Sequence, residues 1–141
     1  MKSVHIDASV ERVFAFHERD DALDLLAPGF PPVRKVSSTP GIQTGARVVL
    51  RIGIFRWVAL HTAYEKNRLF VDEQIEGPFR KWVHRHEFEA EGKKTRLTDR
   101  IEYELPGGSL VNRLAGWSVT LGLRRMFAHR HRVTRATCER P

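Results

Sequence analysis

The sequence predicts an α+β fold in which an antiparallel sheet packs against one long C-terminal helix. Five strand-like runs follow one another between residues 46 and 105, joined by loops of two to four residues. Connections this short join antiparallel neighbours. After Pro106-Gly107-Gly108 the pattern becomes helical as far as about Thr137. That helix, of about 28 residues, is the one predicted element large enough to cover the inner face of such a sheet.

The loops between the runs have recognisable turn chemistry. Gly53-Ile54 fits a type II′ hairpin, which needs a positive φ at its first central residue. Lys66-Asn67 is read as a two-residue loop, and Gly77-Pro78-Phe79 as a three-residue loop. The runs therefore form a meander of neighbouring strands. They are Ala46–Ile52, Phe55–Glu65, Arg68–Glu76, Arg80–Ala90 and Thr95–Leu105.

Smaller elements precede the meander. Ser9 is a suitable N-cap for a short helix with an apolar side. Asp20 or Asp21 caps a second short helix, which Pro28-Gly29 ends. The chain of 141 residues is expected to form a single domain, 1–141. The two strands of this part are Lys2–Asp7 and Val33–Ser38.

The strand after the Gly77-Pro78-Phe79 turn has an unusual inner face. Its charged residues must face water, which sends Trp82, His84, His86 and Phe88 to the interior. Buried imidazoles need hydrogen-bond partners. The neighbouring strands are therefore expected to supply them.

The short loops fix which residues lie opposite one another. They place His61, Asp72 and His84 side by side on the inner face, and His86 beside Asp99. Side chains directly opposite in an antiparallel pair lie about 4.5–5.5 Å apart, within hydrogen-bonding reach. The sequence thus predicts an interior cluster of imidazoles and carboxylates. The same register puts Phe70, Gln74, Trp82 and Tyr103 on this face.

Several segments carry a resemblance to a known family. The central ones read F-V-D-E-Q-I-E-G-P-F-R-K-W-V-H-R-H-E-F (Phe70–Phe88) and T-D-R-I-E-Y-E-L-P (Thr98–Pro106). Together with I-D-A-S-V-E-R-V-F-A-F (Ile6–Phe16) and R-M-F-A-H-R-H-R-V-T (Arg125–Thr134), they make the chain similar to the SRPBCC proteins. This START/Bet v 1-like group includes polyketide cyclase/dehydrase-like members. The resemblance covers essentially the whole chain.

The resemblance implies a helix-grip fold: a curved antiparallel sheet wrapped around the long C-terminal helix, with two short helices after the first strand. It also implies a cavity between sheet and helix, where members bind lipids, sterols, polyketides or other apolar molecules. A minority are enzymes, such as aromatases and cyclases. The inner-face residues and one helix residue then form a candidate ligand-binding set. Its members are His61, Phe70, Asp72, Gln74, Trp82, His84, His86, Asp99, Tyr103 and Trp117.

The polar cluster has more than one interpretation. His61, Asp72 and His84 can form an internal network in which carboxylates accept from imidazole N–H groups. They can equally form the polar end of a ligand pocket. A His paired with an Asp also suits a general base, so whether the chain is an enzyme stays open. Two His and one Asp can hold a metal, but no signature of a known metal class is present, and neither metal nor cofactor is expected.

The C-terminal helix carries an apolar stripe at helical spacing, formed by Leu110, Leu114, Trp117 and Leu121. We expect this stripe to close the cavity or the core. After Gly122 the stripe shifts, which suggests a bend or a rotation of the buried face. The residues toward which it shifts are Met126 and Val133.

Arginines crowd the last turns of this helix and contribute to the formal net charge of +7. A solvated face is the simplest interpretation, since cations near a helix C-terminus are mildly favourable. Contact with an anionic membrane surface or an acidic head group is the alternative. Nucleic acid is not expected, because no stacking aromatic residues interleave with the arginines. The arginines are Arg124, Arg125, Arg130, Arg132 and Arg135.

Other features bear on partners and compartment. Apolar residues on the outer face of the central strands predict a surface for a homodimer. The N-terminus has no apolar segment of a secretory signal, and Cys138 is the single cysteine, which together favour the cytoplasm. The outer-face residues are Val58, Leu60, Tyr64, Val71, Ile75 and Val83.

Three functions follow as hypotheses. The first is binding of a small, largely apolar ligand, lipid or polyketide-like, in the cavity. The second is a cyclase- or dehydratase-type enzyme that uses a His-Asp pair. The third is a regulatory module acting through the outer face and the arginines.

Overall fold

The computed structural model describes residues 1–27 and 32–140, and it confirms the predicted order of elements. Pro28-Gly29, predicted to end the second helix, lies outside the described residues. The strands are β1 (Lys2–Ile6), β2 (Val33–Ser38), β3 (Arg47–Ile52), β4 (Phe55–Glu65), β5 (Leu69–Glu76), β6 (Lys81–Glu91) and β7 (Lys94–Glu104). The helices are α1 (Val10–Glu18), α2 (Ala22–Leu26) and α3 (Gly108–Cys138).

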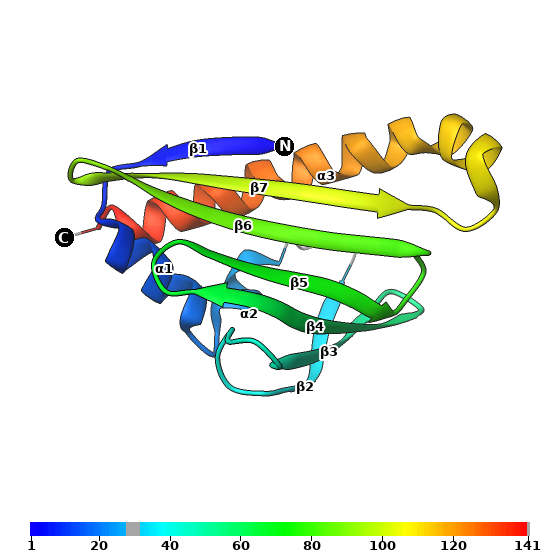
Figure 1. The fold of residues 1–141 in the computed structure, drawn as a ribbon, viewed down its shortest axis with the longest axis horizontal. Helices are drawn as coiled ribbons and strands as arrows, with labels where there is room; N and C mark the ends of the chain where they lie inside the picture. Colours follow the sequence, from blue (N-terminus) through cyan, green and yellow to red (C-terminus); the bar gives the residue numbers. More distant parts are fainter. Residues whose placement is uncertain (28–31, 141) are drawn as a thin grey trace.

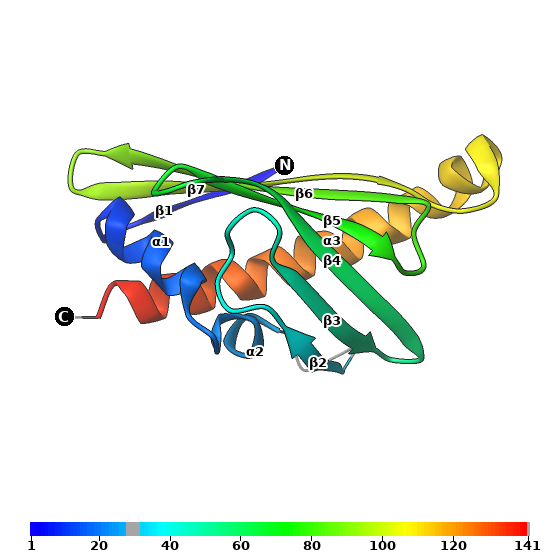
Figure 2. The ribbon, with the colours of Figure 1, turned by 60° about the horizontal axis from the view of Figure 1, so that its bottom comes forward.

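The strands form one antiparallel sheet in the order β1-β7-β6-β5-β4-β3-β2. The sheet is curved, and α3 runs along one of its faces with α1 and α2 on the same side (Figures 1 and 2). This is the predicted α+β helix-grip arrangement. It leaves the inner face of the sheet opposite three helices.

Local sequence signals explain several element boundaries. The hydroxyl of Ser9 accepts a hydrogen bond from the backbone N–H of Arg12 at 3.2 Å, as expected of the N-cap of α1. Gly53 has a φ of 58°, which fits the turn predicted between β3 and β4. Leu105 is joined to the first turns of α3 by Asn112, whose Oδ1 accepts from the Leu105 N–H at 2.7 Å.

Two apolar clusters occupy the interior. The first surrounds Phe14 of α1, which makes edge contacts with Phe70 and Phe88 from the sheet. The second contains Trp57 and Trp82, whose rings meet edge to face at 5.1 Å between centroids. The clusters hold different ends of the sheet against the helices.

A β-bulge changes one predicted pairing. Tyr64 pairs with Phe70 and Glu65 with Leu69, and the register shifts between His61 and Ala63. The loop after β4 therefore has three residues, 66–68, and not the two predicted, Lys66-Asn67. The extra residue of a bulge reverses the alternation beyond it. Tyr64, predicted on the outer face, therefore packs against Phe14 inside. On the N-terminal side of the bulge in β4, the predicted pair His61–Asp72 is present.

The predicted role of the first half of α3 is wrong. Its apolar stripe is exposed, with Trp117 70% and Leu114 65% accessible. The first turns of α3 extend past the ends of β6 and β7 (Figures 1 and 2). The buried face of α3 lies farther along, roughly 100° around the helix from the stripe at the standard 100° per residue. That face consists of Phe127, His131, Thr134 and Cys138.

The outer face of the sheet is less apolar than predicted. Val58 and Val71 are buried, and Val71 pairs with Arg85, which forms an ion pair with Glu87. Ile75 remains 48% exposed. A homodimer on this face therefore stays a prediction. Among the described helices, none is long and apolar enough to cross a membrane.

Candidate functional site

A cavity of about 260 Å³ lies between the inner face of the sheet, α2 and α3. Its wall is mainly apolar, with a polar end formed by imidazoles, a carboxylate and a guanidinium. The apolar side chains include Leu23, Leu26, Val48, Leu50, Ile52, Trp57, Ala59, Phe70, Trp82 and Met126. The polar end consists of His61, Asp72, His84, His86 and Arg130.

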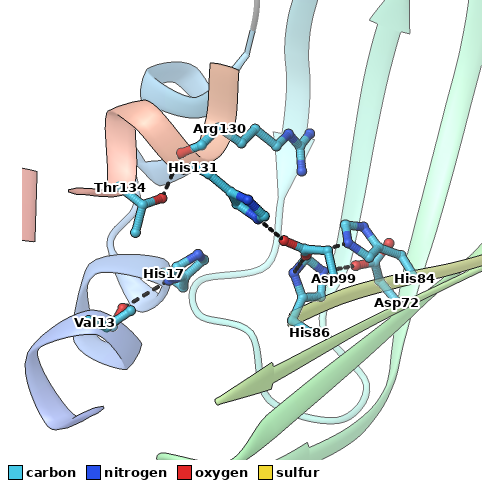
Figure 3. A network of polar contacts seen from close by, with 9 residues as sticks. All are labelled: Val13, His17, Asp72, His84, His86, Asp99, Arg130, His131 and Thr134. Carbon is cyan, nitrogen blue, oxygen red and sulfur yellow. Dashed lines mark hydrogen bonds and ion pairs between the residues drawn. The ribbon is translucent and has the colours of Figure 1, made fainter. Parts of the chain in front are cut away.

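Asp99 of β7 is the centre of the buried polar network (Figure 3). Its Oδ1 accepts from Nε2 of His84 at 2.7 Å, and its Oδ2 accepts from Nε2 of His131 at 2.7 Å. Nδ1 of His86 lies 3.2 Å from Oδ1. Burial disfavours the ionised carboxyl, but the bonds from His131, His84 and His86 outweigh it and hold the pKa of Asp99 well below its usual value. Asp99 is therefore a carboxylate that ties the sheet to α3.

His86 lies between two carboxylates. Its Nε2 is 2.9 Å from Oδ2 of Asp72, while its Nδ1 faces Asp99. Ionised carboxylates only accept, so both ring nitrogens must carry a proton to donate. Burial opposes this charge, yet the bonds to Asp72 and Asp99 raise the pKa of His86. The His86 ring also stacks on Phe70 at 3.8 Å between centroids, a contact that favours a cation.

Asp72 is ionised at neutral pH. Burial disfavours its charge, but the bond from His86 and the nearby His84 and His61 lower its pKa to about 2. His84 is different, because burial and the adjacent His86 lower its pKa despite the bond to Asp99. Neutral His84 thus has its proton on Nε2 and a lone pair on Nδ1.

His61 and His17 are buried neutral imidazoles that bond to backbone carbonyls. Nδ1 of His61 donates to the Ile42 carbonyl at 3.0 Å, and Nδ1 of His17 donates to the Val13 carbonyl at 2.8 Å. Burial lowers the pKa of both, that of His17 to about 4. His61 therefore does not bond to Asp72, although their Cα positions pair as predicted.

The structure brings six of the ten predicted site residues into the cavity wall. They are His61, Phe70, Asp72, Trp82, His84 and His86. That these residues contact a ligand stays a prediction.

The other four predicted residues have different places. Asp99 bonds the imidazoles, as described above, and Trp117 is exposed on the first half of α3. The hydroxyl of Tyr103 donates to the Gly116 carbonyl at 2.9 Å, which joins β7 to α3. The Gln74 amide bonds the Phe79 backbone twice, at 2.6 and 3.2 Å, and fixes the turn after β5. A Cβ on Gly77 would lie 2.3 Å from Oε1 of Gln74, so a larger residue there would displace the Gln74 amide from its present position.

Two positions of the polar network and the cavity wall, His131 and Arg130, did not follow from the sequence. His129 and His131 point in different directions on a helix and cannot act as a pair, but His131 alone reaches Asp99. The spacing of Phe127, His131 and Thr134 was the signal for that buried face. Arg130 was grouped with the solvated arginines, but it lines the cavity.

Asp72, His84 and His86 form the group best placed to hold a metal ion, with ligand atoms within 4.8 Å of one another. However, His86 has a carboxylate at each ring nitrogen, and Nε2 of His84 is bonded to Asp99. A metal would have to replace the bond between His86 and Asp72. The arrangement fits an ion-paired network better than a ready ligand set.

Comparison with solved structures shows the same fold in proteins of low sequence identity. A nucleoside-diphosphate sugar epimerase from Corynebacterium glutamicum aligns with a TM-score of 0.73 at 24% identity, over 94% of this chain and 27% of the other. This chain thus spans about a quarter of that protein. Norcoclaurine synthase from Thalictrum flavum gives 0.71 at 14% identity, covering 99% and 86%. The ZhuI aromatase/cyclase from Streptomyces sp. R1128 gives 0.73 at 12% identity, covering 99% and 92%.

No curated protein sequence matches the chain. A family model does, over residues 6–132, from the last residue of β1 through most of α3. The match thus includes β2 to β7, both short helices and the polar network. The chain belongs to the polyketide cyclase/dehydrase and lipid transport family of SRPBCC-type proteins.

Proposed function

We propose that this protein binds a small, largely apolar ligand, lipid-like or polyketide-like, in the cavity between the sheet and α3. The observation that carries the proposal is the cavity itself, of about 260 Å³, with an apolar wall and polar groups at one end. Ordinary small-molecule pockets have this composition and volumes of roughly 300–1,000 Å³. The cavity lies just below that range, which favours a compact ligand.

Fluorescence titration with N-phenyl-1-naphthylamine, a neutral apolar probe, tests the proposal. We expect saturable binding at one site. Ala59→Phe places a ring in the cavity wall and should weaken binding at least about tenfold, equivalent to about 1.4 kcal/mol. Ala63→Phe on the same strand, outside the cavity wall, is the matched control. Absence of saturable binding, or equal binding by Ala59→Phe, would contradict the proposal.

A second candidate function is dehydration or cyclisation of a polyketide-like substrate. It is favoured by neutral His84, which lies in the cavity wall and is oriented by Asp99 at 2.7 Å. Its Nδ1 can accept a proton from the carbon next to a substrate carbonyl. Return of that proton to a departing β-hydroxyl completes loss of water.

Mass spectrometry of a β-hydroxyacyl thioester incubated with the protein tests this candidate. Loss of water should be observed, and His84→Gln should slow it by about 10²–10⁴-fold, the usual contribution of general acid–base catalysis. His129→Gln, on α3 and outside the cavity wall, should leave the rate unchanged. No turnover by the wild type, or an unaffected His84→Gln, would count against an enzyme.

A further inference from the structure

Arg130 is a cation of the cavity wall that forms no ion pair with any of the described residues. Its Nε is buried and makes no hydrogen bond within the described residues. Arg130 precedes His131 on α3, and both side chains extend from this helix toward the sheet (Figure 3). Burying an N–H donor without a hydrogen bond is unfavourable.

The nearby carboxylates are already engaged. Both oxygens of Asp99 accept from imidazoles, and Asp72 is bonded to His86. Neither forms an ion pair with Arg130 among the described residues, although their charges favour its protonated form. Desolvation outweighs them and lowers the pKa of Arg130, which nevertheless stays a cation because an arginine pKa starts above 12.

We propose that Arg130 binds the carboxylate of the cavity ligand, so that the ligand class is a small apolar acid. The cavity combines the two required features, an apolar wall and one unpaired guanidinium at its polar end. The planar fork of a guanidinium matches a carboxylate, with which it can form two parallel N–H···O bonds. This inference rests on the proposed ligand-binding function and names the chemistry of its ligand.

The test compares decanoate with 1-decanol, which share an apolar chain and differ in the head group. Each displaces N-phenyl-1-naphthylamine at pH 7.5, and the measured quantity is the ratio of the two affinities. We expect the wild type to bind decanoate at least about tenfold more tightly, the usual value of a charge-assisted hydrogen bond in a buried site.

Variants of Arg130 test whether this residue causes the preference for decanoate. Arg130→Met should lower the affinity ratio by about 10- to 100-fold and leave 1-decanol binding unchanged or tighter. Arg130→Lys keeps the charge without the fork and should give an intermediate ratio. Arg132→Met, at an exposed arginine on the same helix, is the control and should keep the wild-type ratio.

Different failures have different meanings. A wild-type protein that binds 1-decanol as tightly as decanoate overturns this inference, even if no variant folds. An unchanged ratio in Arg130→Met also overturns it, while saturable probe binding would still support the proposed function. Binding of neither decanoate, 1-decanol nor the neutral probe overturns both.

Discussion

Nε2 of His84 lies 2.7 Å from Oδ1 of Asp99, although the Cα partner of His84 on β7 is Ile101. The bond therefore runs diagonally between β6 and β7. His86 is the direct partner of Asp99, but its Nε2–H donates to Asp72 on the other side, on β5. Because Asp99 also accepts from His131, one carboxylate joins two strands to α3.

The first prediction concerns Asp99. Asp99→Asn keeps the shape of the side chain but leaves buried imidazoles without their carboxylate. Removing one partner of a buried ion pair usually costs about 3–5 kcal/mol. Urea unfolding should show a loss of this size, with Asp24→Asn at an exposed position as the control. A loss below about 1 kcal/mol would mean that the network contributes little to stability.

Acid sensitivity is the second prediction. The pKa of His17 is lowered by burial from 6.5 to about 4, so between these values the unfolded chain binds more protons than the folded one. Its stabilising effect is fully present above pH 6.5 and is lost as the pH falls toward 4. This change corresponds to roughly 3 kcal/mol, at about 1.4 kcal/mol per pKa unit. His61 and His84, with lowered pKa values, act in the same direction.

Other groups in the network change the pH dependence of the free energy of unfolding in different directions. The raised pKa of His86 gives a contribution that is present below 6.5 and lost as the pH rises through the folded value. The contribution of Asp72 is present above 3.8 and lost as the pH falls toward 2. Urea unfolding of His17→Leu between pH 7 and pH 4 isolates His17, because that variant should lose stability less steeply. Parallel profiles for variant and wild type would contradict the assignment.

Much of this architecture could be predicted from the sequence because short loops fix strand register. The pairs His61–Asp72, Asp72–His84 and His86–Asp99 all lie opposite each other as predicted. Register specifies Cα neighbours but not side-chain rotamers, which is why the diagonal bonds were not foreseen. The bulge before Ala63 was also invisible, since no glycine or proline marks it.

The helix was harder to predict than the sheet. An apolar stripe indicates a buried face only where another element lies opposite, and the first turns of α3 extend beyond the strands (Figure 2). Farther along, the buried face contains His131 and Thr134, which hydropathy alone assigns to solvent. Arg130 was missed for the same reason.

The third prediction tests the placement of the tryptophans. Trp117 is 70% exposed, whereas Trp57 and Trp82 are 9% and 8% exposed in the cavity wall. Iodide should therefore quench mainly Trp117, and Trp117→Phe should remove most of the quenching. The same variant should bind N-phenyl-1-naphthylamine like the wild type, because Trp117 is not in the wall. Weakened binding would instead place the first half of α3 over the cavity.

The last prediction is that α3 has two halves of different local stability. The second half is buried through Phe127, His131, Thr134 and Cys138, while the first half exposes its apolar stripe. Local opening requires little free energy where few apolar contacts are lost. Amide hydrogens in residues 112–121 should therefore exchange faster than those in residues 124–138, as measured by hydrogen–deuterium exchange.

Tyr103 provides the decisive variant, because its hydroxyl bonds the Gly116 carbonyl and holds the first half of α3 to β7. Tyr103→Phe should lower the free energy of local opening of the first half of α3 by about 1 kcal/mol. Amide exchange in residues 112–121 should therefore accelerate about fivefold, with little change in the second half of the helix. Tyr64→Phe loses a comparable bond to Glu18 at 3.0 Å and should leave α3 unaffected. Since local and global opening differ in which amides respond, acceleration along the whole helix would mean that α3 unfolds as one unit and that its exposed turns are not independently loose.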